Sequence, residues 1–353
     1  MIMLESIDTW LMQPEYMPNL CRLSEEGVSF ENFYTPLFLS AGTFNTEIIS
    51  QTGLVPPVTG VSSSIYSTNA FPMSLANLFK NQGYTVNSFH SASPSIYSRG
   101  TVHENLGFSA YHSYADMGMP DYQLDSGLIN AYSLMAPEGK FFSFVITYSG
   151  HGPYTQELEN ISAPHIDAAQ AAVSKAAIEG SAQNISEYTH AVAHAMETDQ
   201  FIGQLIDRLE EEGRLEDTAV LLYADHYGKY MTDKDFLLKI KDVRLSPELY
   251  HTPCVLYGGG IQQAKVDKYC SSLDLVPSII NLYDLPGDRR YYAGDDIFGG
   301  LGGVVPLPGG AWYDGERWYN GGESDPDPEL TSALKRQVSQ SMEAVRVDYF
   351  DKN

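Results

Sequence analysis

The sequence predicts an α/β fold in which a central, mostly parallel sheet is flanked by helices. Short runs of apolar, β-branched or aromatic residues alternate along the chain with segments of helical period. The 353 residues are enough for one large domain with a small appendage. The shares of apolar, charged, Gly and Pro residues are those of an ordinary globular protein, which excludes disordered and fibrous classes.

Six runs are predicted strands, at residues 2–4, 29–34, 85–89, 141–148, 219–223 and 253–257. Four segments are predicted helices, at residues 18–26, 73–82, 186–212 and 328–347. In the first helix, Pro18 suits the opening turn and Gly27 the end. The third helix is marked by an apolar stripe of Ile202, Leu205, Ile206 and Leu209.

The composition changes near residue 300, where Gly, Pro and aromatic residues become frequent. Residues 312–319 predict a hairpin that turns at Asp314-Gly315. We therefore predict a catalytic domain over residues 1–300 and a small hairpin-plus-helix subdomain over residues 301–353. Residues 55–72 and 152–185 are predicted to be long connections, of a kind that often carries function.

The chain is strongly acidic, with 45 Asp and Glu against 21 Lys and Arg and a net charge of −24. This charge repels nucleic acids and anionic lipid head groups, so no nucleic-acid partner is expected. The three cysteines are too few and too scattered for a disulfide framework. No apolar stretch approaches the about 20 residues that span a bilayer. The chain opens almost inside a strand, which suggests that upstream sequence is missing.

Polar residues follow several predicted strands directly. Glu5 follows the first strand, His90 the third, His151 the fourth, and Asp225-His226 the fifth. In open α/β sheets ligands bind beyond the carboxyl ends of the strands. We therefore expect these side chains to converge.

The residue types indicate metal and phosphate chemistry. Glu5, Asp225 and His226 offer two hard oxygens and an imidazole, which suit Mn²⁺, Mg²⁺ or Zn²⁺; the alternative for Asp225-His226 is a simple strand-end turn. Thr43 follows a Gly at an apparent helix N-terminus, where phosphate is favoured, and the alternative is that Thr43 is only an N-cap. A metal-activated threonine is a competent nucleophile.

These motifs resemble the alkaline phosphatase and sulfatase superfamily, and most closely its lipoteichoic acid synthase branch. The resemblance extends from about residue 5 to residue 298. It rests on one set of segments: Leu4-Glu5-Ser6, Met17-Pro-Asn-Leu20, Asn32-Phe-Tyr34, Thr43 with Glu47 four residues later, and Asp225-His226-Tyr227-Gly228.

The resemblance implies that Thr43 is the nucleophile. It also implies that one divalent ion is held by Glu5, Thr43, Asp225 and His226, with Mn²⁺ favoured and Mg²⁺ or Zn²⁺ as alternatives. The Asp-x-x-x-His segment that carries a second ion in two-metal relatives is absent from this sequence. The Cys-x-Pro-x-Arg nucleophile context of sulfatases is absent as well.

The resemblance also implies a substrate site. Arg99, nine residues after His90, corresponds to the family's phosphate-binding arginine, and Tyr97 stands where the family has Trp. His151 matches a histidine that contacts the transferred group and protonates the leaving alkoxide. The chain departs from the family at Ala92 and at Lys229-Tyr230, which leaves the identity of the donor open.

The implied function is that of an extracytoplasmic phosphoglycerol transferase of a bacterial cell membrane, tethered through sequence outside this chain. Its donor would be an anionic glycerophospholipid similar to phosphatidylglycerol, and its acceptor a glycerol-phosphate polymer or a glycolipid. The reaction would pass through a phosphothreonine. The alternatives are a phosphoethanolamine transferase, a phosphodiesterase, or a non-catalytic metal- or glycan-binding ectodomain.

The remaining histidines are expected to be structural. His190 and His194 are predicted to lie on a solvated helix face, because the intervening residues lack the Glu of a zinc protease motif. His251 is expected to pack in the structure. The others are predicted to be surface or loop residues: His103, His112 and His165.

Overall fold

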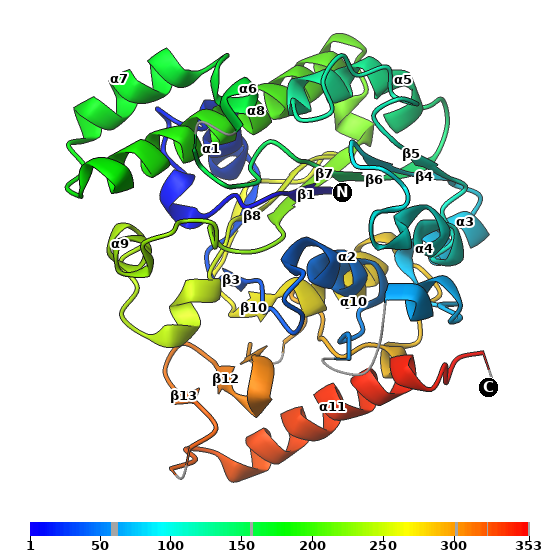
Figure 1. Ribbon diagram of the computed structural model, residues 1–353. Coiled ribbons are helices and arrows are strands. Elements are labelled where there is room, and N and C mark those ends of the chain that lie inside the picture. Colours follow the sequence, from blue (N-terminus) through cyan, green and yellow to red (C-terminus); the bar gives the residue numbers. More distant parts are fainter. Residues whose placement is uncertain (58–62, 156–157, 301–302, 323, 352–353) are drawn as a thin grey trace.

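The computed structural model describes residues 1–57, 63–155, 158–300, 303–322 and 324–351. At its centre lies an eight-stranded sheet with the order β5-β4-β6-β1-β7-β8-β2-β9. Helices cover both faces of this sheet (Figure 1). The predicted α/β class is confirmed.

The sheet is mostly parallel, as predicted, because only β8 runs antiparallel to its neighbours β7 and β2. Its strands are β1 (Ile2–Leu4), β2 (Val28–Phe30), β4 (Thr85–His90), β5 (Ala110–His112), β6 (Phe141–Ile146), β7 (Ala219–Ala224), β8 (Cys254–Gly258) and β9 (Ala264–Val266). Strand β1 lies between β6 and β7, and all three of its residues are buried. A strand that is covered on both faces must be apolar throughout, which explains why its sequence does not alternate.

One strand prediction is wrong in its extent. Residues 29–34 are two strands, because the chain leaves the central sheet after β2 and continues as β3 (Phe33–Tyr34). Strand β3 pairs instead with β10 (Cys270–Ser271) in a two-stranded sheet. The break falls at Glu31-Asn32, where the side chain of Asn32 donates to the carbonyl of Asp267 at 2.8 Å. Apolar residues on both sides of this break hide it in the sequence.

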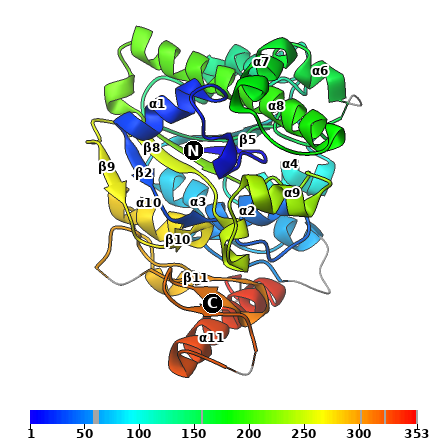
Figure 2. The ribbon, with the colours of Figure 1, turned by 90° about the vertical axis from the view of Figure 1, so that its left-hand side faces the viewer.

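The helices form a layer on each face of the sheet (Figures 1 and 2). One layer contains α1 (Pro18–Glu26), α5 (Tyr132–Met135), α6 (Glu159–Ser162), α7 (Ile166–Ala176) and α8 (Ala182–Glu211). The other contains α2 (Gly42–Thr52), α3 (Leu75–Asn81), α4 (Arg99–Asn105) and α10 (Leu275–Tyr283). Each layer packs on the sheet around a separate apolar core. The first core includes Leu20 and Ile202, and the second includes Ile48 and Ile279.

The segment 152–185 is not the long connection that we predicted, since it contains α6 and α7. Helix α7 buries only Ala169 and Val173, so its apolar stripe is too weak to be recognised in the sequence. In the other predicted connection, 55–72, residues 58–62 lie outside the described residues, and residues 63–67 form a short 3₁₀ helix.

The predicted C-terminal hairpin is confirmed, with Trp312 opposite Tyr319 in β12 (Trp312–Tyr313) and β13 (Trp318–Tyr319). Strand β11 (Val305–Pro306) adds a third strand. Helix α11 (Pro328–Arg346) then packs back on the main body, where Val345 is buried in the second core. The division of the chain at residue 300 stays a prediction.

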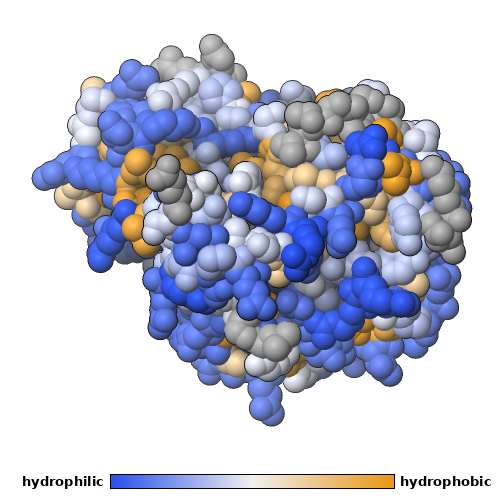
Figure 3. Space-filling view, turned by 90° about the horizontal axis from the view of Figure 1, so that it is seen from below, coloured by the Kyte–Doolittle hydropathy of each residue, from blue (hydrophilic) through white to orange (hydrophobic). Residues whose placement is uncertain are grey.

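The face that is seen from below in Figure 1 is mainly hydrophilic, with hydrophobic residues in small separate patches (Figure 3). Across the ranges that the structure describes, none of the helices combines the length and the apolar character needed to cross a membrane.

The register of the parallel strands positions the functional residues. Leu4 lies opposite Ala224, so Glu5 and Asp225 leave the sheet side by side, and the amide of Asp225 donates to the carbonyl of Leu4 at 3.1 Å. On the other side of β1, the end of β6 is level with His90 at the end of β4. The carboxyl ends of these neighbouring strands therefore meet at one edge.

A buried ion pair ties the loop after β1 to this edge. The ammonium of Lys241, just beyond α9 (Lys234–Ile240), contacts the carboxylate of Asp8, and both side chains are almost fully buried. Asp8 also accepts a hydrogen bond from the amide of Gly228 at 2.8 Å. The pair thus fixes the turn that follows Asp225 and His226.

We expect Lys241→Met to lower the free energy of unfolding by about 3 kcal/mol, because it leaves the carboxylate of Asp8 buried without a counter-charge. Urea denaturation would measure the loss. The matched control is Lys239→Met on α9, where the lysine is mostly exposed and the loss should stay under about 1 kcal/mol. Equal losses in the two variants would contradict the role given to the Asp8 pair.

Candidate active site

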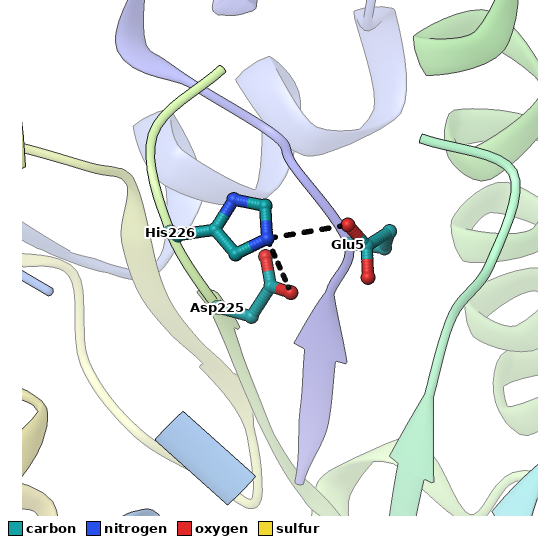
Figure 4. Close-up of side chains that lie close together, drawn as sticks. All are labelled: Glu5, Asp225 and His226. Carbon is teal, nitrogen blue, oxygen red and sulfur yellow. Dashed lines mark ion pairs between the residues drawn. The ribbon is translucent and has the colours of Figure 1, made fainter. Parts of the chain in front are cut away.

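Three side chains meet beyond the ends of β1 and β7 (Figure 4). Nε2 of His226 lies 3.4 Å from Oε1 of Glu5 and 3.3 Å from Oδ2 of Asp225. One donor atom from each residue lies within 4.8 Å of the others, and all three residues are buried. Within the described part of the chain, Oδ2 of Asp225 and Nε2 of His226 have no hydrogen-bond partner. Buried polar atoms rarely lack partners, so this donor set fits a divalent cation.

The electrostatics lead to the same interpretation. Burial raises the pKa of Asp225 to about 6. Burial also raises the pKa of Glu5, and the nearby charge of Asp225 raises it further. Burial lowers the pKa of His226 to about 4, so its imidazole is neutral near pH 7. Two adjacent buried carboxylates are unfavourable as anions unless a cation compensates them, and a neutral imidazole is the form that binds a metal.

Neighbouring groups orient the three donors. The backbone amide of Ser6 donates to Oδ1 of Asp225 at 2.8 Å, and its hydroxyl donates to Oε1 of Glu5 at 2.7 Å. Ser6 holds this position with a left-handed backbone (φ 55°), which is uncommon for a residue other than Gly. Nδ1 of His226 donates to the carbonyl of Tyr227 at 2.9 Å, which leaves the lone pair of Nε2 directed at the carboxylates.

Helix α2 brings Thr43 to the same point. Its N-cap is Ala41, so the alternative that Thr43 is an N-cap is wrong. The hydroxyl of Thr43 instead donates to Oε2 of Glu5 at 2.8 Å. This approach requires Gly42, because a Cβ at that position would lie 2.4 Å from the ring of His226. One turn further along, the hydroxyl of Thr46 donates to the carbonyl of Asp225 at 2.6 Å.

Arg99 lies at the start of α4, and its side chain is almost fully buried. Its Nε donates to Oε2 of Glu47 at 2.8 Å, and its guanidinium lies 5.3 Å from the ring centre of Tyr97. Tyr97 stacks on Phe44 of α2 and remains 42 % exposed. Burial, followed by the charge of Arg99, lowers the pKa of His90 to about 3, so His90 is neutral. Arg99 therefore supplies the positive charge of this group.

His151 and Tyr230 form a second polar pair beside the metal-binding group. Nδ1 of His151 contacts the carbonyl of Gly152, and Nε2 lies 2.7 Å from the hydroxyl of Tyr230. Because a carbonyl only accepts, Nδ1 carries a proton, and Nε2 is the nitrogen that faces the hydroxyl of Tyr230. The ring of Tyr230 also lies edge-on to His226 at 5.8 Å, and the ammonium of Lys229 lies 5.3 Å from the ring centre of Tyr230. Both positions at which the sequence departs from the family after Asp225-His226-Tyr227-Gly228 thus lie at this site.

Several histidine predictions are wrong. His103 is fully buried, and its Nε2 lies 2.7 Å from Oε1 of Glu47. His194 is also fully buried and contacts the hydroxyl of Ser162 at 3.1 Å, so the predicted solvated face of α8 is not solvated there. Nδ1 of His190 binds the same hydroxyl at 2.7 Å.

The spacing of Arg99 and His103 is a sequence signal for the side of the helix on which His103 lies. Residues four apart share one face of a helix, so a buried Arg99 implies that His103 points the same way. His251 packs on Tyr34 with ring centres 5.2 Å apart, as expected. Of the predicted site residues, the structure brings Glu5, Asp225, His226 and Thr43 into one cluster, and their role as ligands stays a prediction.

Comparisons with known proteins agree with this architecture. Residues 5–285, most of the chain, match the Sulfatase family. The lipoteichoic acid synthase 2 of Bacillus subtilis is 21% identical over 381 residues, covering 98% of this chain and 56% of that protein. The chain thus spans about half the length of this curated relative.

Three solved structures share the fold. The lipoteichoic acid synthase LtaP of Listeria monocytogenes has a TM-score of 0.76 at 20% identity, over 98% of this chain and 90% of that one. The phosphoglycerol transferase GacH of Streptococcus pyogenes, in complex with sn-glycerol-1-phosphate, has a TM-score of 0.66 at 17% identity. The match covers 98% of this chain and 84% of that one. The C-terminal periplasmic domain of EptC from Escherichia coli has a TM-score of 0.56 at 14% identity. The match covers 91% of this chain and 92% of that one.

These similarities confirm the predicted sulfatase-like fold and the resemblance to lipoteichoic acid synthases. Enzymes of this superfamily use a divalent metal ion, in keeping with the buried donor set described above. The match covers both strand ends that carry this donor set, after β1 and after β7. The chain belongs to the Sulfatase family.

Proposed function

We propose that this chain is the catalytic domain of a metal-dependent phosphoglycerol transferase, with Thr43 as its nucleophile. One observation carries the proposal: the hydroxyl of Thr43 lies 2.8 Å from Glu5, inside the cluster of donors that Glu5 forms with Asp225 and His226. The lipoteichoic acid synthases and GacH, which share the fold, are phosphotransferases.

Glu5, Thr43, Asp225 and His226 would hold the cation, and Mn²⁺ is our first choice, with Mg²⁺ or Zn²⁺ as alternatives. When bound, the cation supplies positive charge that favours the ionised carboxylates and an ionised threonine oxygen. Only one such group of donors is found in the residues that the structure describes, in agreement with a one-metal site.

The chain's own residues perform a double displacement. The hydroxyl of Thr43 loses its proton to solvent, its oxygen attacks the phosphorus of an anionic glycerophospholipid, and the bond from phosphorus to the diacylglycerol oxygen breaks. A glycerol or sugar hydroxyl then attacks the phosphothreonine, which releases Thr43 and transfers phosphoglycerol to the acceptor. Arg99 binds the phosphate oxygens throughout, next to Tyr97 and the neutral His90.

Tyr230 and His151 would control the proton of the leaving group. Nε2 of His151 and the hydroxyl of Tyr230 are hydrogen-bond partners at 2.7 Å beside the site. Diacylglycerol leaves as an alkoxide that must be protonated, and we propose that this pair gives the proton and regains one from solvent.

We expect the reaction to occur at the extracytoplasmic face of a bacterial cell membrane, with a membrane lipid as donor. The acceptor would be a glycerol-phosphate polymer or a glycolipid. The alternatives on this scaffold are transfer of phosphoethanolamine, in line with the weaker similarity to EptC, and simple phosphodiester hydrolysis. Incubation with labelled phosphatidylglycerol or phosphatidylethanolamine, followed by product analysis, separates the three reactions. Metal binding without turnover of any phosphodiester would favour a non-catalytic binding domain.

Thr43→Ala should reduce turnover by about three orders of magnitude or more, because it removes the nucleophile. Thr43→Ser keeps a hydroxyl and should retain measurable turnover. The melting temperatures of both metal-free variants should stay close to that of the wild type, since Thr43 makes one side-chain hydrogen bond at the helix start. Full activity of Thr43→Ala would remove Thr43 from the proposed role.

Metal binding should depend on pH through Asp225. Its pKa is raised in the folded protein from 3.8 to about 6, so the stability it contributes is present at low pH and is lost as the pH rises through about 6. A cation binds the ionised form and restores this stability. The increase in melting temperature on adding Mn²⁺ should therefore be larger at about pH 7.5 than at about pH 5. In Asp225→Asn, Mn²⁺ should raise the melting temperature little at either pH. If the Mn²⁺-induced rise in the wild type did not depend on pH, Asp225 would not be the group that controls metal binding.

Tyr230→Phe should lower kcat by roughly tenfold or more, because it removes the hydrogen bond to His151 and keeps the ring. The Mn²⁺-induced rise in melting temperature should be unchanged. Tyr227→Phe is the matched control in the same turn, and its activity should remain near the wild-type value. Equal activity of Tyr230→Phe and the wild type would exclude Tyr230 from proton transfer.

A further inference from the structure

We propose that Glu47 and His103 are positioning residues that hold Arg99 in register with the nucleophile Thr43. This inference rests on the proposed function, in which Arg99 binds the phosphate group. It gives a role to two side chains that form a buried unit with Arg99. The carboxylate of Glu47 binds Nε of Arg99 at 2.8 Å through one oxygen and Nε2 of His103 at 2.7 Å through the other.

Two helices supply the unit with matched spacing. On α2, Thr43 and Glu47 lie four residues apart, so both point to the same side of the helix. On α4, Arg99 and His103 are also four residues apart and face α2 together. The carboxylate of Glu47 therefore joins the helix of the nucleophile to the helix of the phosphate-binding arginine. A shift of either helix would move Arg99 relative to Thr43.

The unit is buried, and the positive charge of Arg99 balances the negative charge of Glu47. Glu47 and His103 are fully buried, and the side chain of Arg99 is 4 % exposed. Burial alone would raise the pKa of Glu47, but the charge of Arg99 and the hydrogen bond from His103 lower it to about 2. Because an ionised carboxylate only accepts, Nε2 of His103 must carry a proton. A buried carboxylate that is satisfied on both oxygens has a fixed orientation.

This arrangement leaves one edge of Arg99 for a ligand. Nε is used by Glu47, whereas the two terminal nitrogens of Arg99 form no hydrogen bond with any described residue. Burial lowers the pKa of Arg99, but the charge of Glu47 and, more weakly, that of Glu5 raise it above its usual value, so the guanidinium lies within electrostatic reach of the metal-binding group. Phosphate oxygens are suitable acceptors for the remaining N–H groups.

The backbone before Arg99 supports the same interpretation. Tyr97 and Ser98 both have left-handed backbone angles, with φ of 55° and 56°. Such a conformation is unfavourable for a residue other than Gly and persists only where surrounding contacts enforce it. Here the stacking of Tyr97 on Phe44 and the grip of Glu47 on Arg99 anchor both sides of the segment to α2.

Glu47→Gln tests the inference, because the amide keeps the shape of the side chain and loses its charge. The probe is sn-glycerol-1-phosphate, titrated calorimetrically into the Mn²⁺-loaded protein. We expect Glu47→Gln to weaken binding by about 10–100-fold, and Arg99→Met to weaken it by at least as much. The double variant should bind no more weakly than Arg99→Met alone, since Glu47 acts only through Arg99. KM for the donor should rise more than kcat falls.

Controls separate positioning from stability. Glu104→Gln changes the exposed carboxylate next to His103 on α4 and should leave binding unchanged. Glu47→Asp keeps the charge but shortens the reach, and it should bind with intermediate affinity; it replaces Glu47→Gln if that variant fails to fold. The effect of His103→Gln should be smaller than that of Glu47→Gln, because the amide can still donate to Glu47.

The outcomes are distinct. Normal binding by Arg99→Met would overturn the phosphate-binding role of Arg99, and with it the part of the proposed function on which this inference rests. Weak binding by Arg99→Met with normal binding by a folded Glu47 variant would overturn the inference alone. Additive losses in the double variant would do the same, because they would mean that Glu47 acts independently of Arg99.

Discussion

The side-by-side burial of Glu5 and Asp225 is the constraint on which the rest of this structure depends. The register of β1 and β7 fixes the separation of Glu5 and Asp225, because the residues just before them, Leu4 and Ala224, are paired. Burial raises the pKa of both carboxyl groups, and the charge of Asp225 raises that of Glu5 further. A bound cation would favour the ionised form of both carboxyl groups. The orientation of His226, the strained Ser6 and the close approach of Gly42 all serve a site that is built around positive charge.

Helix α2 connects this charge problem to the proposed chemistry. One buried face of it carries Thr43, Thr46 and Glu47, which contact Glu5, the carbonyl of Asp225, and the pair of Arg99 and His103. A helix is rigid over one turn, so a single element sets the distances between nucleophile, metal-binding group and phosphate-binding group. These contacts explain why α2 carries polar side chains on a buried side.

The segment after His226 gives this protein its own character within the family. Tyr230 places a phenol beside His151, and Lys229 places an ammonium over the ring of Tyr230, at the two positions where the sequence departs from the family after Gly228. In the proposed reaction, a bulky aromatic ring at this position would affect both the room for the head group and the route of the leaving-group proton.

The sequence by itself determined the fold class and the residues that cluster at the site, because apolar strands that end in Glu5, His90 and Asp225 place those residues at one edge of a parallel sheet. It did not determine the break between β2 and β3, because apolar residues continue across it. Only the tertiary structure decided that His103 is buried against Glu47 and that Tyr230 engages His151. The first contact joins residues 56 positions apart and the second joins residues 79 positions apart. Local periodicity does not predict which distant side chains will meet.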